Sequence, residues 1–550
     1  MEFLNGSNGV KRMGNVLAAK ADGDKWLPLM QHLEDTKNVM EQLLINYVAP
    51  SVVVASGLDH DMFHRLAVFV AYTHDIGKAT SAFQIKMCSA LSGYRAMIEG
   101  EGFSAKVGGL EERSPHALAG ASILNTFFNI DESICEIVAS HHGKPLDIGK
   151  DSNYTYQTKR LTDNYYSPTS YGAYSEVWSE IVDMANDISD ISDIKAIPIK
   201  AKMIITGLLI MADWIASCED FFSLLETYST EVEADRALKG MAALKLQPYN
   251  EFNLISMDGE LFKKRFGFIP NKMQKTVIEK ADQIVSPGIM IIEAPMGLGK
   301  TEAALAAAEV ESSAAGTGGI FFGLPTRGTA DAMFDRVKDW TDIVSQGNNV
   351  SISLAHSTAG FNDSYETLRT KIYDENKTGA SVNSWMAGMY RKLLPDFTIG
   401  TVDQALFTVL KSKFLMLLHL GISGKTVIID EVHSYDDYMT EYMKSMLSWL
   451  GAYRLPVILL SATLTRERRN ELISAYIGSE VTKGTDAYPA VTWSDGGTVY
   501  SQAVEADDIK RKEVCIENID KINTDEIMKE LLSDGGCAGV ICDTVSIKIF

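Results

Sequence analysis

Hydrophobic residues follow two different spacings along this chain. In the N-terminal part they recur at the spacing of a helix face, as Leu66, Ala67, Val70 and Ala71 do. From residue 289 onward, short apolar runs alternate with helical segments, and these runs cover residues 289–292, 320–323, 351–354, 398–401, 427–429 and 457–460. Such alternation is typical of a parallel sheet covered by helices. The pattern therefore predicts a helical part followed by an α/β part.

The length of 550 residues exceeds what one hydrophobic core usually serves, so we expect several domains. The helical pattern is interrupted at residues 246–250, which read Leu-Gln-Pro-Tyr-Asn. We therefore predict a helical domain at residues 1–235, a linker at 236–262 and an α/β domain at 263–495.

Composition and charge exclude several classes of protein. Hydrophobic residues make up 46% of the chain and charged residues 22%, which is typical of a globular protein. The chain shows neither an apolar stretch of about 20 residues nor a signal peptide, so we expect a cytoplasmic protein without membrane contact. The six cysteines form no C-x-x-C pair, which argues against a zinc ribbon and a disulfide framework. A net charge of -21 restricts any nucleic-acid contact to a local track.

A glycine-rich segment follows the predicted strand at 289–292. Residues 293–301 read Glu-Ala-Pro-Met-Gly-Leu-Gly-Lys-Thr and precede a predicted helix. Gly297 and Gly299 allow a turn whose backbone N–H groups surround phosphates, with Lys300 on the β- and γ-phosphates and Thr301 on Mg²⁺. The segment predicts a nucleotide site.

Two carboxylates come directly after the predicted strand at 427–429. Asp430 and Glu431 stand at the carboxyl end of that strand, where open α/β sheets bind their ligands. We expect Asp430 to hold Mg²⁺ and Glu431 to orient and deprotonate the attacking water.

Histidines are concentrated near the N-terminus, where seven of the ten lie at positions 32, 60, 64, 74, 116, 141 and 142. A lone histidine on an apolar face is usually a core residue, and we favour that interpretation for His60 and His64. Asp213 lies in the apolar run 208–215, where a metal would compensate the charge of a buried carboxylate. Imidazole and carboxylate ligands suit manganese, iron, cobalt or nickel. The candidate ligands are His74, Asp75, His116, His141, His142 and Asp213.

The order of these candidates resembles the HD family of metal-dependent phosphohydrolases. The resemblance implies that His74 and Asp75 hold one or two metal ions that activate water, and that Lys78 orients a phosphate. By order and context, His32 matches the isolated first histidine of the family, with His64 as the alternative.

Further motifs resemble the superfamily 2 helicases. Asp430-Glu431-Val432-His433 is similar to their DExH box and Ser461-Ala462-Thr463 to their third motif. Residues 268–274 resemble the adenine-reading element, from Phe268 to the hydrogen-bonding Gln274. The ATP-site residues thus implied are Phe268, Gln274, Gly297, Gly299, Lys300, Thr301, Asp430, Glu431, His433, Ser461 and Thr463. The residues implied to contact the backbone of single-stranded nucleic acid are Thr326, Arg327, Thr401 and Gln404.

An HD domain followed by a DExH motor resembles the CRISPR-associated nuclease-helicases of type I interference systems. The motifs at residues 74–80, 354–357, 400–404 and 430–436 look like variants of that family. The resemblance implies an all-α HD domain and an α/β RecA-like P-loop domain. It also implies recruitment by an RNA-guided surveillance complex, nicking and degradation of single-stranded DNA, and 3′-to-5′ movement driven by ATP and Mg²⁺.

The family's motor has two RecA-like domains, and residues 535–545 look like only the first strand of the second. We therefore expect a connecting segment at 496–533 and the truncated start of that domain at 534–550. A chain of this kind would cleave single-stranded DNA yet hardly hydrolyse ATP, unless a separate chain supplies the missing domain.

Two other functions compete with this interpretation. The HD domain could hydrolyse a nucleotide, with the ATPase domain as its regulator. The chain could also be a silent DNA-binding module, although intact His74, Asp75, Asp213, Lys300 and Glu431 argue against silence.

Overall fold

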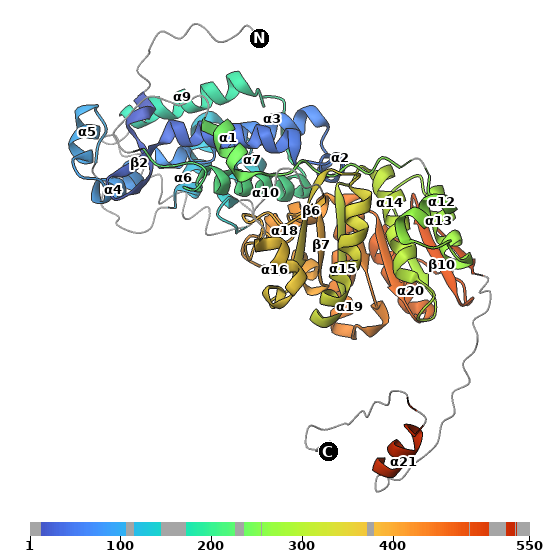
Figure 1. Ribbon diagram of the computed structural model, residues 1–550. Helices are drawn as coiled ribbons and strands as arrows, with labels where there is room; N and C mark the ends of the chain where they lie inside the picture. Colours follow the sequence, from blue (N-terminus) through green and yellow to red (C-terminus); the bar gives the residue numbers. More distant parts are fainter. Residues whose placement is uncertain are drawn as a thin grey trace. The chain divides into compact units, whose positions relative to one another are not determined.

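The computed structural model describes residues 13–105, 115–144, 172–225, 236–254, 256–370, 379–482, 484–504, 524–533 and 535. The chain divides into two compact units, Met1–Glu505 and Ala506–Phe550 (Figure 1). The second unit contains the helix α21, Thr524–Leu531. Apart from Gly535, the predicted start of a second RecA-like domain at 534–550 lies outside the described residues.

The N-terminal part of the first unit is helical, as predicted. Its helices are α1 Leu29–Asn46, α2 Pro50–Ser56, α3 His60–Thr73, α4 Ser81–Ala90, α5 Tyr94–Gly100, α6 His116–Phe128, α7 Glu132–Ser140, α9 Gly172–Ile188, α10 Ile199–Ala216 and α11 Arg236–Leu244. The expectation of an all-α domain missed one antiparallel hairpin, formed by β1 Ala18–Asp22 and β2 Lys25–Pro28. These strands are too short to show an alternating pattern, and Trp26 of β2 also pairs with Leu225, which is remote in the sequence.

Helix α10 lies on the side of the helical part that faces the α/β part (Figure 1). It contacts α1, α3 and α7, and on another side it contacts α18 (Leu415–Ser423) of the α/β part. This explains why its sequence is apolar on nearly all sides, since a helix covered by several neighbours has no polar face. Gly207 allows the approach to α18, because a Cβ there would lie 2.5 Å from the Met416 carbonyl oxygen.

The α/β part is built on a nine-stranded sheet with the order β11-β10-β3-β9-β8-β4-β7-β5-β6. The strands are β3 Ile289–Glu293, β4 Gly319–Leu324, β5 Asn349–Ala355, β6 Gly379–Ser381, β7 Phe397–Thr401, β8 Lys425–Ile429, β9 Val457–Ser461, β10 Ala490–Asp495 and β11 Thr498–Ala503. The six predicted strands are confirmed, and neighbouring strands from β3 to β6 run parallel. The sheet is mixed rather than purely parallel, because β10 pairs antiparallel with both β3 and β11.

Helices cover this sheet (Figure 1). They are α12 Gly259–Phe266, α13 Lys272–Gln283, α14 Lys300–Ala315, α15 Arg327–Val344, α16 Asp363–Thr370, α17 Asp403–Leu406, α18, α19 Asp437–Tyr453 and α20 Arg466–Ile477. One buried hydrophobic cluster contains Leu208 of α10 together with Val427 and Leu459 of the sheet. The helical part and the α/β part therefore share a continuous core.

The predicted linker at 236–262 contains α11 and the start of α12. In α11 the buried Arg236 donates to Asp35 of α1 at 2.7 Å, so this stretch packs against the helical part. Among the described residues no single helix is long and apolar enough to cross a membrane. Within the same residues, only α1 and α2 taken together, which meet at a bend of 109°, reach that length and apolar composition.

Candidate functional site

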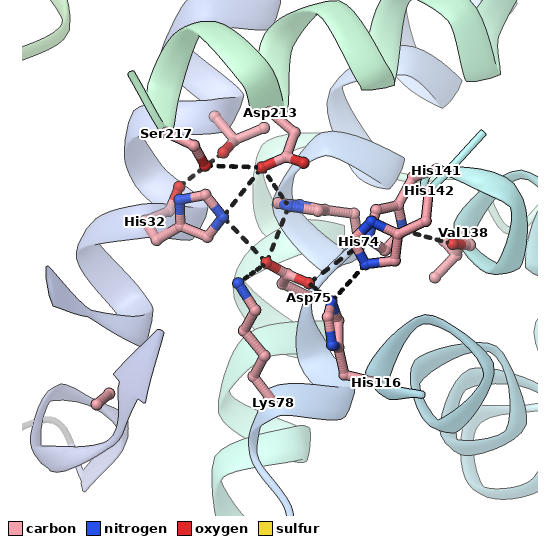
Figure 2. Close-up of polar contacts among 12 residues, drawn as sticks. His32, His74, Asp75, Lys78, His116, Val138, His141, His142, Asp213 and Ser217 are labelled. Atoms are coloured by element: carbon pink, nitrogen blue, oxygen red, sulfur yellow. Dashed lines mark hydrogen bonds and ion pairs between the residues drawn. The ribbon is translucent and has the colours of Figure 1, made fainter. Parts of the chain in front are cut away.

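The candidate metal ligands lie in or directly after α1, α3, α6, α7 and α10. Figure 2 shows their side chains gathered in one place. His32 lies in α1, and His74 and Asp75 directly follow α3. The remaining ligands are His116 at the start of α6, His141 and His142 after α7, and Asp213 in the last turn of α10. Because α3 has an apolar stripe that buries it, its C-terminal end carries His74 and Asp75 into the interior.

A first group of ligand atoms comes from His32, His74, Asp75 and Asp213, and all four atoms lie within 4.8 Å of one another. The His32 Nε2 atom lies 3.0 Å from Asp75 Oδ2 and 3.4 Å from Asp213 Oδ1. The His74 Nε2 atom lies 3.3 Å from Asp75 Oδ2. These residues form a compact mixed set of nitrogen and oxygen donors, which suits a divalent transition metal.

A second group contains His116, His141 and His142, again within 4.8 Å. The Nε2 atoms of His116 and His142 are 2.7 Å apart, so two nitrogen lone pairs would face each other unless a proton or a cation lies between them. Asp75 Oδ1 lies 3.3 Å from His116 Nε2 and 3.7 Å from His141 Nε2. Asp75 thus faces the first group with one oxygen and the second group with the other. His142 is exposed, so the second group opens to solvent.

The surrounding backbone sets the tautomers of two buried histidines. His74 Nδ1 donates to the Ala71 carbonyl at 2.9 Å, and His141 Nδ1 donates to the Val138 carbonyl at 2.6 Å. In its neutral form each ring would present the lone pair of Nε2 to the cluster, and neither Nε2 atom has a hydrogen-bond partner. Asp75 Oδ1 is likewise buried without one. Buried polar atoms without partners are costly, and metal ligation would satisfy all three.

The electrostatics of the cluster also call for positive charge. Burial by itself opposes ionisation of Asp75, but Lys78, His74 and His116 hold the pKa of its carboxyl well below the usual value. Burial opposes a charge on His74 too, yet the carboxylates of Asp75 and Asp213 raise the pKa of that ring to about 10. Two buried carboxylates thus draw a proton onto a ring that would otherwise be neutral. Divalent cations would supply that charge, so the residues present fit a metal centre.

All seven proposed metal ligands therefore lie together, and His32 rather than His64 belongs to the two groups of ligands found among the described residues. Lys78 Nζ contacts Asp75 Oδ2 at 2.5 Å. Sequence analysis missed Ser217, whose Oγ donates to Asp213 Oδ1 at 3.1 Å. The spacing could have indicated this contact, because Ser217 caps α10 four positions after Asp213, one helical turn further along.

The nucleotide-site motifs gather at the carboxyl ends of the neighbouring strands β3, β9 and β8. Between β3 and α14, Gly297 and Gly299 adopt positive φ angles of 81° and 76°. A Cβ on Gly299 would lie 2.4 Å from Gln274 Nε2, so glycine is required there. The Lys300 ammonium donates to the Ala294 carbonyl at 2.7 Å, and burial lowers its pKa.

The side chain of Gln274 is hydrogen-bonded to the glycine-rich loop. Its Nε2 donates to the Gly299 carbonyl at 3.1 Å, and its Oε1 accepts from the Asn271 N–H at 2.9 Å in a capping box at the start of α13. The side chain is nearly fully buried, whereas Phe268 is 44% exposed. The same glutamine thus caps a helix and holds the loop, a role that sequence analysis did not foresee.

The two carboxylates after β8 connect with the residues after β9. The Glu431 N–H donates to Asp430 Oδ1 at 2.8 Å, and burial raises the pKa of Asp430. His433 Nδ1 lies 3.4 Å from Glu431 Oε2 and 3.2 Å from Ser461 Oγ. Ser461 Oγ in turn donates to the Thr463 carbonyl at 2.9 Å. A continuous polar chain therefore joins the DExH box to the third motif.

A groove of about 740 Å³ contains the four residues expected to contact nucleic acid, Thr326, Arg327, Thr401 and Gln404. Thr326 caps α15, and its hydroxyl accepts from the Thr329 N–H. The sequence did not indicate that His356, Phe407, Tyr438 and Tyr442 also line this groove.

Comparison with known proteins agrees with this division. Residues 18–222 match the family model "Cas3, HD domain" and residues 271–472 match "DEAD/DEAH box helicase". The "CRISPR-associated nuclease/helicase Cas3" of Streptococcus thermophilus is 37% identical, over 94% of this chain and 60% of that protein. The chain thus spans about 60% of the length of this curated relative.

Solved structures give the same result for the fold. A crystal structure of a CRISPR-associated protein matches 98% of this chain and 63% of its own, with 28% identity and a TM-score of 0.77. A chain in a pre-nicking CRISPR RNA-guided surveillance complex matches 88% of this chain and 53% of its own. Its TM-score is 0.61 and its identity 24%, so this likeness concerns the fold alone.

Proposed function

Because this chain belongs to the Cas3 nuclease/helicase family, with an HD domain followed by a DEAD/DEAH box helicase domain, we propose that it cuts single-stranded DNA at the HD site. The observation that carries this proposal is the shared carboxylate of Asp75. Its two oxygens face two groups of ligands, in which the buried His74 Nε2 and His141 Nε2 atoms have no hydrogen-bond partner. Such a site holds two divalent transition metal ions, from the set of manganese, iron, cobalt and nickel.

The residues of the HD site have separate parts in the proposed cleavage. Bound divalent ions supply a Lewis acid for the scissile phosphate and lower the pKa of a bound water. Asp75 and Asp213 hold negative charge in the interior, and the rings of His74 and His141 are kept in one orientation by their backbone partners. Lys78, beside Asp75, orients the phosphate. The strand enters from the side of His142, where the cluster is open.

In the helicase domain we propose that Lys300 leaves the Ala294 carbonyl to bind the β- and γ-phosphates of ATP. Thr301 and Asp430 hold Mg²⁺, and Glu431 orients and deprotonates water. Phosphate contacts in the groove, from Thr326, Arg327 and Thr401, guide the strand without reading its sequence.

The packing between the two parts supports a functional link between them. Asp213 lies in α10, which packs against α18. Phe414, just before α18, donates its N–H to the Gly143 carbonyl at 2.8 Å, next to His142. We propose that a strand moved 3′-to-5′ by ATP hydrolysis passes to the HD site, and that an RNA-guided surveillance complex recruits the protein and selects the target.

The test is cleavage of a circular single-stranded DNA by the purified chain with Mn²⁺, Co²⁺, Ni²⁺ or Mg²⁺. We expect cleavage with a transition metal and none from Asp75→Ala. Asp61→Ala is the matched control, because Asp61 lies in α3, the helix directly before Asp75, is exposed and contacts Arg65 instead. Cleavage by folded Asp75→Ala at the wild-type rate would refute the assignment of the HD site. Hydrolysis of free nucleotides in preference to DNA would favour a nucleotide phosphohydrolase.

A further inference from the structure

Two tyrosines on α19 line the groove that contains Thr326, Arg327 and Thr401. Tyr438 is 68% exposed, and Tyr442 lies one helical turn further along. Their ring centroids are 4.9 Å apart at 73°, and the hydroxyls are hydrogen-bonded to each other at 2.9 Å. The hydroxyls thus satisfy each other, while a large part of the Tyr438 ring remains open to the groove. A ring this exposed has a face available to a ligand.

The remaining groove lining has little net charge. Its side chains include one guanidinium, Arg327, and one carboxylate, Asp403. Burial lowers the pKa of His356, which favours the neutral form of that ring. In a protein with a net charge of -21, ionic attraction in this groove cannot by itself hold a polyanion. A strand bound here therefore needs a further source of affinity that does not depend on charge.

We infer that Tyr438 and Tyr442 form a stacking platform for the bases of single-stranded DNA, an inference that rests on the proposed function. The platform provides the aromatic part of the groove, while Thr326, Arg327 and Thr401 provide groups for phosphates. Phe407, which is 40% exposed, adds a third ring to the same lining. Stacking suits a motor that moves along any sequence, because every base has a π-face. The platform binds unstacked bases, so it favours single strands over duplexes.

The experiment measures the anisotropy of a fluorescein-labelled dT20 and of an abasic strand with the same number of phosphates. The variants are Tyr438→Ala, Tyr438→Phe, Arg327→Ala and, as a matched control, Tyr500→Ala. Tyr500 is similarly exposed, at 47%, but lies on the strand β11 and does not line the groove. Truncation of the exposed Tyr438 ring leaves the buried core unchanged, so these proteins are expected to fold.

We expect Tyr438→Ala to weaken dT20 binding by between about 5-fold and 150-fold, the range measured for one base on one aromatic ring. Tyr438→Phe and Tyr500→Ala should bind dT20 as the wild type does, and Tyr438→Ala should bind the abasic strand like the wild type. Unchanged dT20 binding by Tyr438→Ala, or an equal loss on the abasic strand, would overturn the platform. If Tyr438→Phe loses as much as Tyr438→Ala, the hydroxyl rather than the ring binds, which also overturns it.

The proposed function fails in a different way. If the wild type does not bind dT20, or if Arg327→Ala has no effect on either strand, the groove is not the path of the DNA. Weakening by Arg327→Ala on both strands without any effect of Tyr438→Ala would retain the path and remove only the platform.

Discussion

The HD site and the nucleotide site of this chain are organised in opposite ways. The HD ligands come from five helices that are distant in the sequence, and several of their buried donor atoms have no partner. The nucleotide site comes from short motifs at the ends of adjacent strands, and its residues bind one another. Lys300 binds the Ala294 carbonyl, and Gln274 binds the Gly299 carbonyl.

This difference determines how much the binding of metal or of ATP can stabilise the folded protein. Burial makes an unsatisfied carboxylate or imidazole costly, so the HD site gains folding stability when cations bind. In the nucleotide site, some side chains already have hydrogen-bond partners, such as the Ala294 carbonyl for Lys300. ATP must therefore replace existing hydrogen bonds, and the positive φ angles of Gly297 and Gly299 leave the loop able to rearrange. Metal binding should therefore stabilise the fold more than ATP binding does.

The largest expected effect is the loss of metal binding in Asp213→Ala. For the wild type, Mn²⁺ at a hundred times its Kd should stabilise the fold by about 2.7 kcal/mol, seen as a rise in Tm. Asp213→Ala removes a ligand, so we expect Mn²⁺ affinity to fall more than about 100-fold in calorimetry and the rise in Tm to vanish. The exposed Asp220 provides the control, Asp220→Ala. An undiminished rise in Tm for Asp213→Ala would contradict the assigned ligand set.

The next effect separates the two sites. Lys300→Ala removes the ammonium that we assign to the β- and γ-phosphates, so we expect binding of a fluorescent ATP analogue to weaken at least about 10-fold. Cleavage of single-stranded DNA with Mn²⁺ should be unchanged, because the HD ligands lie in other helices. Loss of that cleavage in Lys300→Ala would show that the two sites are not separable in this chain.

The third prediction concerns Glu311, a buried carboxyl in the α/β part that belongs to neither site. Its burial should make the stability of the protein depend on pH. Neither oxygen of Glu311 in α14 has a hydrogen-bond partner, and burial raises its pKa to about 8. Between the ordinary value of 4.5 and pH 8, the unfolded chain loses this proton while the native chain keeps it, so native stability falls as pH rises.

Glu311→Gln cannot ionise and should remove this loss. Relative to the wild type, its free energy of unfolding should gain nothing below pH 4.5, rise by about 1.4 kcal/mol per pH unit between pH 4.5 and about 8, and then level off, as measured by urea unfolding. Glu309→Gln on the same helix should instead destabilise the protein, because Glu309 binds the buried Arg265 at 2.7 Å. A parallel pH profile for wild type and Glu311→Gln would contradict the burial argument.

The smallest effect concerns Ser217, which orients a metal ligand. Ser217→Ala removes the hydrogen bond to Asp213 Oδ1. We expect Mn²⁺ affinity to fall about 10-fold, the smaller end of the losses seen when a residue hydrogen-bonded to a metal ligand is removed. Ser217→Thr keeps a hydroxyl and should retain most of the affinity. Equal affinities of all three proteins would show that the serine only ends the helix.

Much of the α/β part was predictable from local sequence. The runs at 289–292 and 427–429 became β3 and β8, and the loop before Lys300 joins a strand to a helix as expected. These features depend on side-chain periodicity and on glycine, which act within a few neighbouring residues. The strand β10 and the edge strand β11 were missed. The pairing of β10 with β3, which lies about 200 residues earlier, could not be predicted from local sequence, whereas β11 pairs with its neighbour β10 across the turn at Gly496 and Gly497.

The sequence by itself determined which residues have metal-binding or phosphate-binding chemistry, since donor type and motif spacing are local properties. Only the tertiary structure decided which of these residues meet. Packing around α10 brings His32, and not His64, to Asp75, and it leaves Asp75 between two groups of ligands. Packing of α14 against β8 and β9 buries Glu311 without a hydrogen-bond partner. These outcomes depend on contacts between elements far apart in the chain, which no periodicity within one segment can specify.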